Sequence, residues 1–201
     1  MITLDGSTQR QFTFPGDLQA ATDYYRDFDT ILGLLPHITL VHKYAPNQYR
    51  ALYHTTELGV YRVKIYCDLQ VRYNAVTRTL EVNPLPGRPL IKQSVTVQAL
   101  TAQGLFSSRS IFQADGSHTR IDYALQIGAR LPKPFGLGLI PDGVMSHIAN
   151  SIAEWRIHEI AEGFIAKSIE AYRTAKPARP ELCPVVLPRP VARVARDRQT
   201  A

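Results

Sequence analysis

The chain has 201 residues, of which 45% are hydrophobic, and this length and composition predict a single globular domain with one core. It contains no run of about 18 apolar residues that would span a membrane, and its first residues lack the basic-then-apolar order of a signal peptide. Its two cysteines, Cys67 and Cys183, fall in a strand pattern and in a proline-rich tail, so no structural disulfide is indicated. We therefore expect a cytoplasmic protein, with peripheral contact to a membrane as a further expectation.

The positive charge is concentrated at the C-terminal end. The net charge is +6, and residues 176–201 hold six basic residues against two acidic ones, so residues 1–175 are nearly balanced. This distribution argues against a nucleic-acid-binding surface on residues 1–175, which are predicted to form the domain. The remaining 176–201 are rich in proline and arginine and are predicted to be a disordered basic tail. An anionic membrane or an acidic protein is the expected partner of this tail.

The N-terminal part predicts a strand, two short helices and a hairpin. Phenylalanines alternate with polar residues over 11–14, which predicts a short strand. Apolar side chains then recur at helical spacing over 17–28 and 31–35. Two strand-like runs, 37–45 and 48–58, follow, and the proline and asparagine between them suit the tight turn of a hairpin.

The clearest strand patterns lie in the middle of the chain. Over 60–73 the odd-numbered residues are apolar or aromatic, so this face is predicted to be buried, with Arg62, Lys64 and Asp68 facing water. Weaker strand patterns follow over 76–82, 94–100 and 104–113. The last strand, 119–131, again has apolar odd-numbered positions. Sheets that are buried on one face and wet on the other are typically antiparallel.

The segment from Pro141 to Ala175 predicts one long helix, or two helices fused end to end. Proline and aspartate begin it and a lysine and a proline end it, as helix termini favour. Its apolar residues form two stripes, Val144, Ile148, Ile152 and Trp155 first, then Ile157, Ile160, Phe164 and Ser168. At 100° per residue these stripes point to nearly opposite sides of one helix, so two different surfaces must cover it.

This order of elements resembles the helix-grip fold of the START-like (SRPBCC) superfamily. More closely, Leu-Pro-Lys-Pro-Phe at 131–135 and Leu-Ile-Pro-Asp-Gly at 139–143 are similar to the segment before the last helix in the DUF1997 group, known mainly from cyanobacteria and plastid-bearing organisms. The likeness covers roughly residues 8–174. It implies an α+β fold in which a bent antiparallel sheet of about seven strands wraps the long C-terminal helix, with two short helices after the first strand. It also implies a cavity for hydrophobic ligands, since relatives bind lipids, quinones, sterols or hormones, and some cyclise or dehydrate polyketides.

The inward strand faces and the first helical stripe supply the candidate ligand-binding residues. They are Tyr61, Val63, Ile65, Tyr73, Tyr123, Leu125, Ile148, Ile152 and Trp155. A buried tyrosine hydroxyl needs a hydrogen-bond partner, which is either the protein and its water or the polar end of a ligand. The loop before the helix carries Phe135, Leu137, Leu139 and Ile140 between glycines. It is either packed over the sheet or a gate that touches a membrane, and the resemblance favours the gate.

No residue pattern predicts a reaction. The six histidines share no i, i+4 spacing, and no CxxC or HExxH pattern occurs, so neither a metal site nor a cofactor is expected. Cys67 lies on an apolar face, where a thiol is normally inert. We therefore expect a non-enzymatic carrier or sensor of a lipid-, isoprenoid-, quinone- or pigment-like molecule. The alternatives are an enzyme like the polyketide cyclases and dehydratases, and an interaction or assembly protein whose cavity is filled.

Overall fold

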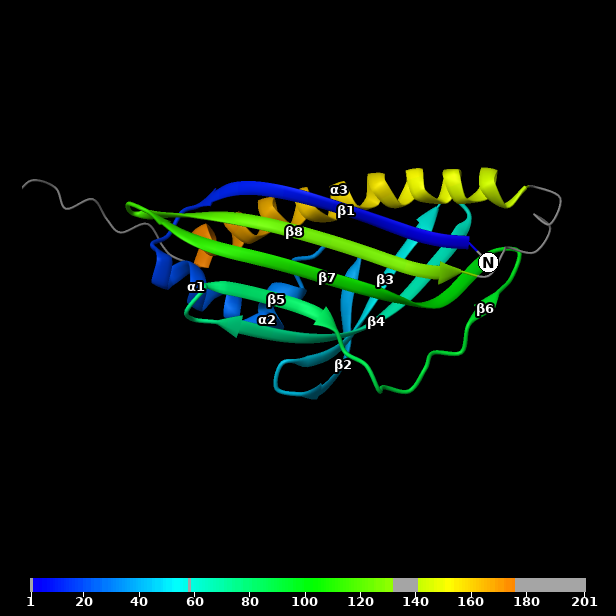
Figure 1. Ribbon diagram of the computed structural model, residues 1–201, viewed down its shortest axis with the longest axis horizontal. Coiled ribbons are helices and arrows are strands. Elements are labelled where there is room, and N and C mark those ends of the chain that lie inside the picture. The colour runs from blue at the N-terminus through cyan, green and yellow to red at the C-terminus, as the bar shows by residue number, and fades with distance from the viewer. Residues whose placement is uncertain (1, 58, 132–140, 176–201) are drawn as a thin grey trace, which may run out of the picture.

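The computed structural model describes residues 2–57, 59–131 and 141–175. They form an α+β domain with a strongly bent sheet, two short helices after the first strand and one long C-terminal helix (Figure 1). The architecture predicted from the sequence is therefore confirmed. The predicted tail, 176–201, and the predicted gate, 135–140, lie outside the described residues.

The sheet contains eight strands. They are β1 (Ile2–Phe14), β2 (Ile38–Ala45), β3 (Gln48–Glu57), β4 (Tyr61–Asn74), β5 (Thr79–Pro84), β6 (Ser94–Val95), β7 (Ala99–Asp115) and β8 (His118–Leu131). Their order is β1-β8-β7-β5-β4-β3-β2, with β6 paired to β7 off this path. The pairings are antiparallel except where β4 and β7 also meet directly in parallel, at 62–66 and 99–103. Further along, β5 separates these two strands and is antiparallel to both.

The direct contact of β7 with its neighbours depends on Gly104. A Cβ atom at this position would lie 2.5 Å from Cγ2 of Ile65 and 3.1 Å from the carbonyl oxygen of Gly128. Real Cβ atoms essentially never come within 3.0 Å of another heavy atom, so a larger residue here would force the Ile65 side chain to shift and would crowd the Gly128 carbonyl.

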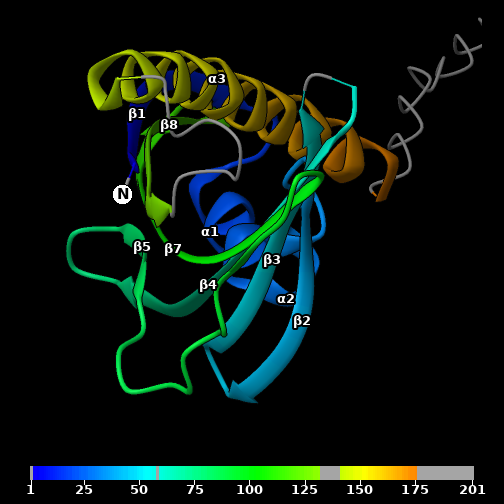
Figure 2. The ribbon, with the colours of Figure 1, turned by 90° about the vertical axis from the view of Figure 1, so that its right-hand side faces the viewer.

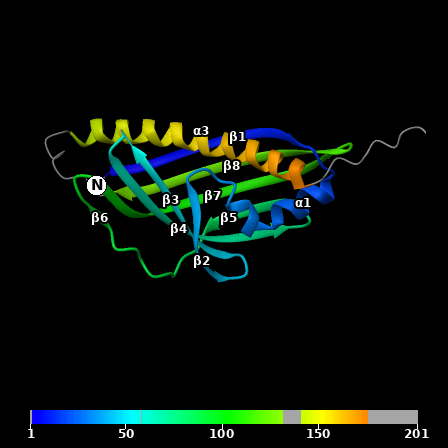
Figure 3. The ribbon, with the colours of Figure 1, turned by 180° about the vertical axis from the view of Figure 1, so that it is seen from behind.

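Two short helices, α1 (Leu18–Arg26) and α2 (Phe28–Leu32), lie inside the bend of the sheet (Figure 2). Asp17 caps α1, since its side chain accepts a hydrogen bond from the backbone N of Ala20 at 2.8 Å. The long helix α3 (Asp142–Ala175) crosses the open side of the bend and lies along β1 (Figures 2 and 3). Within the described ranges, no helix is both long and apolar enough to cross a bilayer.

The two apolar stripes of α3 have different surroundings. In the second half, Ile157 and Phe164 are buried in the main core. In the first half, Val144, Ile148 and Trp155 are 51%, 46% and 59% exposed. The change of apolar face seen in the sequence is therefore a change of environment along one continuous helix.

Hydrogen bonds attach α1 to the second half of α3. The hydroxyls of Tyr25 and Ser168 lie 2.9 Å apart, and the Tyr24 hydroxyl donates to the carbonyl oxygen of Ser168 at 3.0 Å. Burial raises the pKa of Tyr25 well above its ordinary value. These bonds explain how Ser168, which is fully buried, is tolerated within an apolar stripe.

Three predicted strand boundaries need correction. β1 begins at Ile2 rather than at residue 11, because all of its residues pair with β8. The predicted strand 94–100 is reduced to the two residues of β6, and β7 already begins at Ala99. β5 begins at Thr79, because the Asn74 side chain accepts hydrogen bonds from the next backbone N–H groups and forms a turn there.

The inward faces predicted for β4 and β8 are confirmed. On β4, Val63 and Ile65 are partly buried, while Arg62 and Lys64 between and beside them are exposed. On β8, the odd-numbered side chains over 119–131 are buried or partly buried. The odd-numbered positions of both strands therefore line the inside of the bend.

Asp68 is the exception, because it is 5% exposed although the alternation predicts a wet position. The loop after β5 covers it, and the backbone N of Leu85 donates to the Asp68 carbonyl oxygen at 2.8 Å. Arg50 donates to both carboxylate oxygens of Asp68 at 2.7 and 2.8 Å, and also to the carbonyl oxygen of Pro89 at 2.7 Å. Part of the outer face is thus buried around an ion pair.

Candidate functional site

A cavity of about 590 Å³ lies between the first half of α3 and the inner face of the sheet. Its walls come from β1, β3, β4, β7, β8 and α3, with the loop after α2 at one end, and most of the lining side chains are aliphatic. Val60, Val97 and Ile148 line it and are also 74%, 72% and 46% exposed, so they mark an opening to solvent. The volume falls within the range of small-molecule sites in proteins.

Small side chains explain why this region is hollow. Ala149 and Ala153 face the cavity one turn apart on α3, and Ala51 and Ala129 face it from β3 and β8. Further along α3 the corresponding space is filled by large side chains such as Phe164. The same interlayer space is therefore a packed core at one end and an open volume at the other.

One ion pair forms the charged part of the described lining. Arg156, on α3, donates from Nε and Nη2 to the two carboxylate oxygens of Glu57 at 3.0 and 3.2 Å. Its Nη1 donates to Glu159 at 2.6 Å, and Nε2 of His37 lies 3.3 Å from the other Glu159 oxygen. Arg156 and Glu57 line the cavity, with side chains 12% and 15% exposed. Glu159 and His37 are not among the described lining residues.

Hydrogen bonds within this network favour the charged forms of Arg156 and Glu159. Burial opposes the charge of Arg156, but the hydrogen bonds that it donates to Glu57 and Glu159 outweigh this effect and raise the pKa of the guanidinium above its ordinary value. Burial likewise opposes the charge of Glu159, but the hydrogen bonds from Arg156 and His37 outweigh it and lower the pKa of that carboxyl. Both shifts favour the charged forms, so Arg156 and Glu159 are held as an ion pair beside the cavity.

Three further polar side chains line the cavity. Burial raises the pKa of Tyr53 and that of Cys67 to about 12, so neither group acts as a base or nucleophile at neutral pH. The Tyr61 hydroxyl is buried without a hydrogen-bond partner among the described residues, and burial raises its pKa as well. Within 2–57, 59–131 and 141–175, no His, Cys, Asp and Glu side chains gather as a metal site would require.

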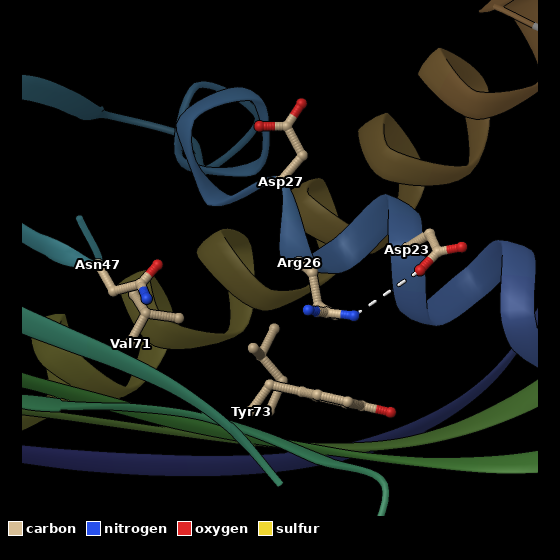
Figure 4. Close-up of a pocket in the computed structure, with 7 residues that line it drawn as sticks. Asp23, Arg26, Asp27, Asn47, Val71 and Tyr73 are labelled. Atoms are coloured by element: carbon tan, nitrogen blue, oxygen red, sulfur yellow. Dashed lines mark ion pairs between the residues drawn. The ribbon is translucent and has the colours of Figure 1, made fainter. Parts of the chain in front are cut away.

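A second pocket, of about 580 Å³, lies between the end of α1, the β2–β3 turn, β4 and β5 (Figure 4). It is lined by Asp23, Arg26, Asp27, Asn47, Val71, Tyr73 and Leu80. Arg26 points toward Tyr73, with its guanidinium carbon 5.1 Å from the ring centre, and Nη1 lies 3.9 Å from Asp23. This pocket has charges of both signs around a small apolar floor, whereas the cavity under α3 is apolar over most of its surface.

No protein-family model matches the chain, and neither does any curated protein. Solved structures do match it. A START superfamily protein from Mycobacterium smegmatis is 13% identical with a TM-score of 0.51, and the match covers 85% of this chain and 99% of that one. A conserved protein from Geobacillus kaustophilus is 10% identical with a TM-score of 0.52, covering 86% and 97%. The chain has the START-like helix-grip fold.

A third matching structure is a protein of a biosynthetic pathway. The di-domain ARO/CYC StfQ from the steffimycin biosynthetic pathway is 13% identical with a TM-score of 0.50. The match covers 86% of this chain and 53% of that one. Sequence identities this low show the fold alone. A function for this chain therefore has to be inferred from the residues that line the cavity under α3.

The structure brings together five of the nine residues predicted to bind a ligand. Those that line the cavity under α3 are Tyr61, Val63, Ile65, Ile148 and Ile152. Tyr73, Tyr123, Leu125 and Trp155 lie elsewhere. The predicted gate residues Phe135, Leu137, Leu139 and Ile140 lie outside the described residues.

The other four residues were predicted on the same strand faces and helical stripe as the cavity residues. They lie at other points along these strands and this helix, where the surroundings differ. Tyr123 is 4% exposed and packs on Phe164, with ring centres 5.4 Å apart, and Leu125 lies in the same core. Tyr73 lines the second pocket. Trp155 is on the outer side of α3, 59% exposed. One face of a long strand can thus serve the core at one end and the cavity at the other.

Sequence reasoning missed the ion pair of Glu57 and Arg156. These residues are 99 positions apart, and no local pattern connects them. A signal for the hollow itself was present, because Ala149 and Ala153 stand at i, i+4 in the first half of α3, where larger residues would be expected in a packed helix.

Proposed function

We propose that this protein binds and carries a hydrophobic small molecule, lipid-, isoprenoid-, quinone- or pigment-like, in the cavity beneath α3. The observation that carries the proposal is an apolar volume of about 590 Å³ with an opening and a single ion pair in its described lining. Apolar pockets with few polar groups are the usual form of such sites. Transfer of an apolar molecule from water into this space is favourable in proportion to the apolar area buried.

The chemistry of the cavity supports a carrier better than an enzyme. Tyr53 and Cys67 hold their protons at neutral pH, and Glu57 is held in a bidentate ion pair. Acid–base catalysis is most effective with a group whose pKa is near the working pH, and neither Tyr53 nor Cys67 fits that requirement. A cyclase-like enzyme therefore remains the second candidate, supported only by a fold shared with StfQ.

An interaction protein with a filled cavity is the third candidate. That alternative expects the predicted aromatic residues to occupy the space, yet of Tyr61, Tyr73, Tyr123 and Trp155 only Tyr61 lines it. The open volume argues for a ligand.

Three further proposals rest on the sequence alone. They are membership of the DUF1997 group, a cytoplasmic location and an acidic partner for residues 176–201.

The carrier proposal is tested by native mass spectrometry and solvent extraction of the protein purified from its own organism. We expect an apolar molecule to copurify in a defined stoichiometry and to leave the protein unchanged after release and rebinding. Recovery of a chemically converted product would favour the enzyme. If no small molecule copurifies or rebinds, the carrier proposal is wrong.

We also propose that the cavity opening makes weak contact with a lipid surface. Val60 and Val97 are largely exposed on two different turns at the opening, and exposed apolar side chains that lie together are typical of interaction sites. Replacing both with serine should lower co-sedimentation with phosphatidylcholine vesicles by about fivefold or more, because two buried valines contribute this much. The matched control is Val76→Ser, since Val76 is 93% exposed in the β4–β5 turn, away from the opening. Equal losses in both variants would contradict a role for the opening, as would a large fall in the thermal midpoint.

A further inference from the structure

Resting on the proposed function, we infer that the ligand is uncharged and amphipathic, with a carbonyl or hydroxyl group that hydrogen-bonds to the Arg156–Glu57 pair. Among the described lining residues, this pair carries the only formal charges facing an otherwise apolar space. A purely apolar molecule would leave these groups without water and without a new partner. A molecule with one polar end would restore a hydrogen bond there.

The N–H groups of Arg156 that are not used within the protein determine which polar group of a ligand it can bind. A guanidinium has five N–H donors, and three are used by Glu57 and Glu159. A ligand carbonyl oxygen can accept from one of the others. A ligand hydroxyl can also donate to a Glu57 oxygen, because each carboxylate oxygen accepts more than one hydrogen bond.

The charge balance argues against a ligand anion. Arg156 already faces two carboxylates, so a fatty-acid or phosphate head would be a third anion around one cation. A ligand cation is disfavoured for a different reason. Glu57, the carboxylate that lines the cavity, is already paired with Arg156, so a ligand cation at Glu57 would also lie beside the positive guanidinium.

The size of the cavity limits the apolar part. A volume of about 590 Å³ equals about 20 water-sized volumes of ~30 Å³ each. A chain or ring system of up to about 20 non-hydrogen atoms therefore fits inside the described walls. A single-chain lipid or a small isoprenoid suits this limit better than a two-chain phospholipid.

The test is displacement of a neutral, environment-sensitive apolar dye by five molecules with the same chain of about 12 carbons, which fits the cavity. They are dodecane, 2-dodecanone, 1-dodecanol, dodecanoate and dodecylammonium. We expect the ketone and the alcohol to bind about tenfold or more tightly than the alkane and than both ions, because one hydrogen bond to a charged group is gained. Tightest binding by the anion or the cation would overturn the inference.

Variants separate the ion pair from other polar groups. Glu57→Leu combined with Arg156→Met, which removes both charges and every hydrogen-bonding group of the pair, should abolish the preference for the ketone and alcohol while the dye still binds. Lys64→Gln, an exposed site on the outer face, should leave the preference intact. If Tyr61→Phe abolishes the preference and the double variant does not, the anchor is the Tyr61 hydroxyl and the inference is wrong.

The outcomes also separate this inference from the carrier proposal. If the dye and all five chains bind equally well, the cavity is a carrier site without a polar anchor, and only the inference falls. If neither the dye nor any chain binds, the carrier proposal falls and the inference with it. The wild-type series alone distinguishes these results, so they do not depend on the variants folding.

Discussion

Replacing Arg50 with methionine is expected to lower the free energy of unfolding by about 3–5 kcal/mol, the usual cost of breaking a buried ion pair. The Asp68 side chain is 3% exposed, and Arg50 is the cation that balances it. Tyr44 and Gln103 also donate to this carboxylate, at 3.1 and 3.4 Å, but they carry no charge. The variant would therefore leave a buried anion uncompensated.

Urea denaturation of the wild type and three variants would measure this effect. Arg109→Met is the matched control, because the Arg109–Glu81 pair has side chains 58% and 46% exposed, and such pairs contribute less than about 1 kcal/mol. The double variant Arg50→Met/Asp68→Leu should recover most of the lost stability, since both charges are removed. If Arg50→Met behaves like Arg109→Met, the Asp68 site is not buried as described.

Replacing Ala149 with tryptophan is expected to weaken ligand binding by at least about tenfold with little change in stability. Ala149 faces the cavity from α3, so an indole ring there would occupy space needed by the ligand. In a packed core such an enlargement costs about 1–3 kcal/mol. Here the ring enters an open volume, so the free energy of unfolding should stay within about 1 kcal/mol.

Binding of the neutral dye and thermal unfolding of the same samples would test this prediction. Ser151→Trp is the matched control, because Ser151 is exposed on the same helix two positions away. We expect this control to bind the dye like the wild type. Undiminished binding by Ala149→Trp would mean that the ligand lies elsewhere, and the pocket around Arg26 and Tyr73 would then be the next site to test.

The fold could be predicted because its longest elements have strong internal patterns. The alternation over 60–73 and 119–131 determines which faces are inward, and α3 has clear start and end signals. The first part of β1 was missed because its alternating positions are polar as well as apolar, so only pairing with β8 identifies it as a strand. Tertiary contact decides such a segment.

The site could be predicted only in part, for a physical reason that Tyr61 and Tyr123 illustrate. Both are inward-facing tyrosines on well-predicted strands. Tyr123 meets Phe164 and is core, whereas Tyr61 lies where α3 presents alanines and borders the cavity. Periodicity determines the face of a residue, but what lies opposite depends on how a distant helix is placed. The same is true of Asp68, which a distant arginine and loop bury.

The pairing of β1 with β8 has a consequence for the order in which the chain folds during synthesis. Phe14 pairs with Thr119 and Ile2 with Leu131, and α3, which follows β8 in the chain, lies along β1. While the ribosome makes the intervening residues, the first strand has neither its neighbour nor its cover. Contacts between parts so distant in the chain form slowly, and unpaired strand edges are prone to association during that time. In nascent chains of this protein, β1 is therefore exposed to aggregation until the ribosome has made β8 and α3.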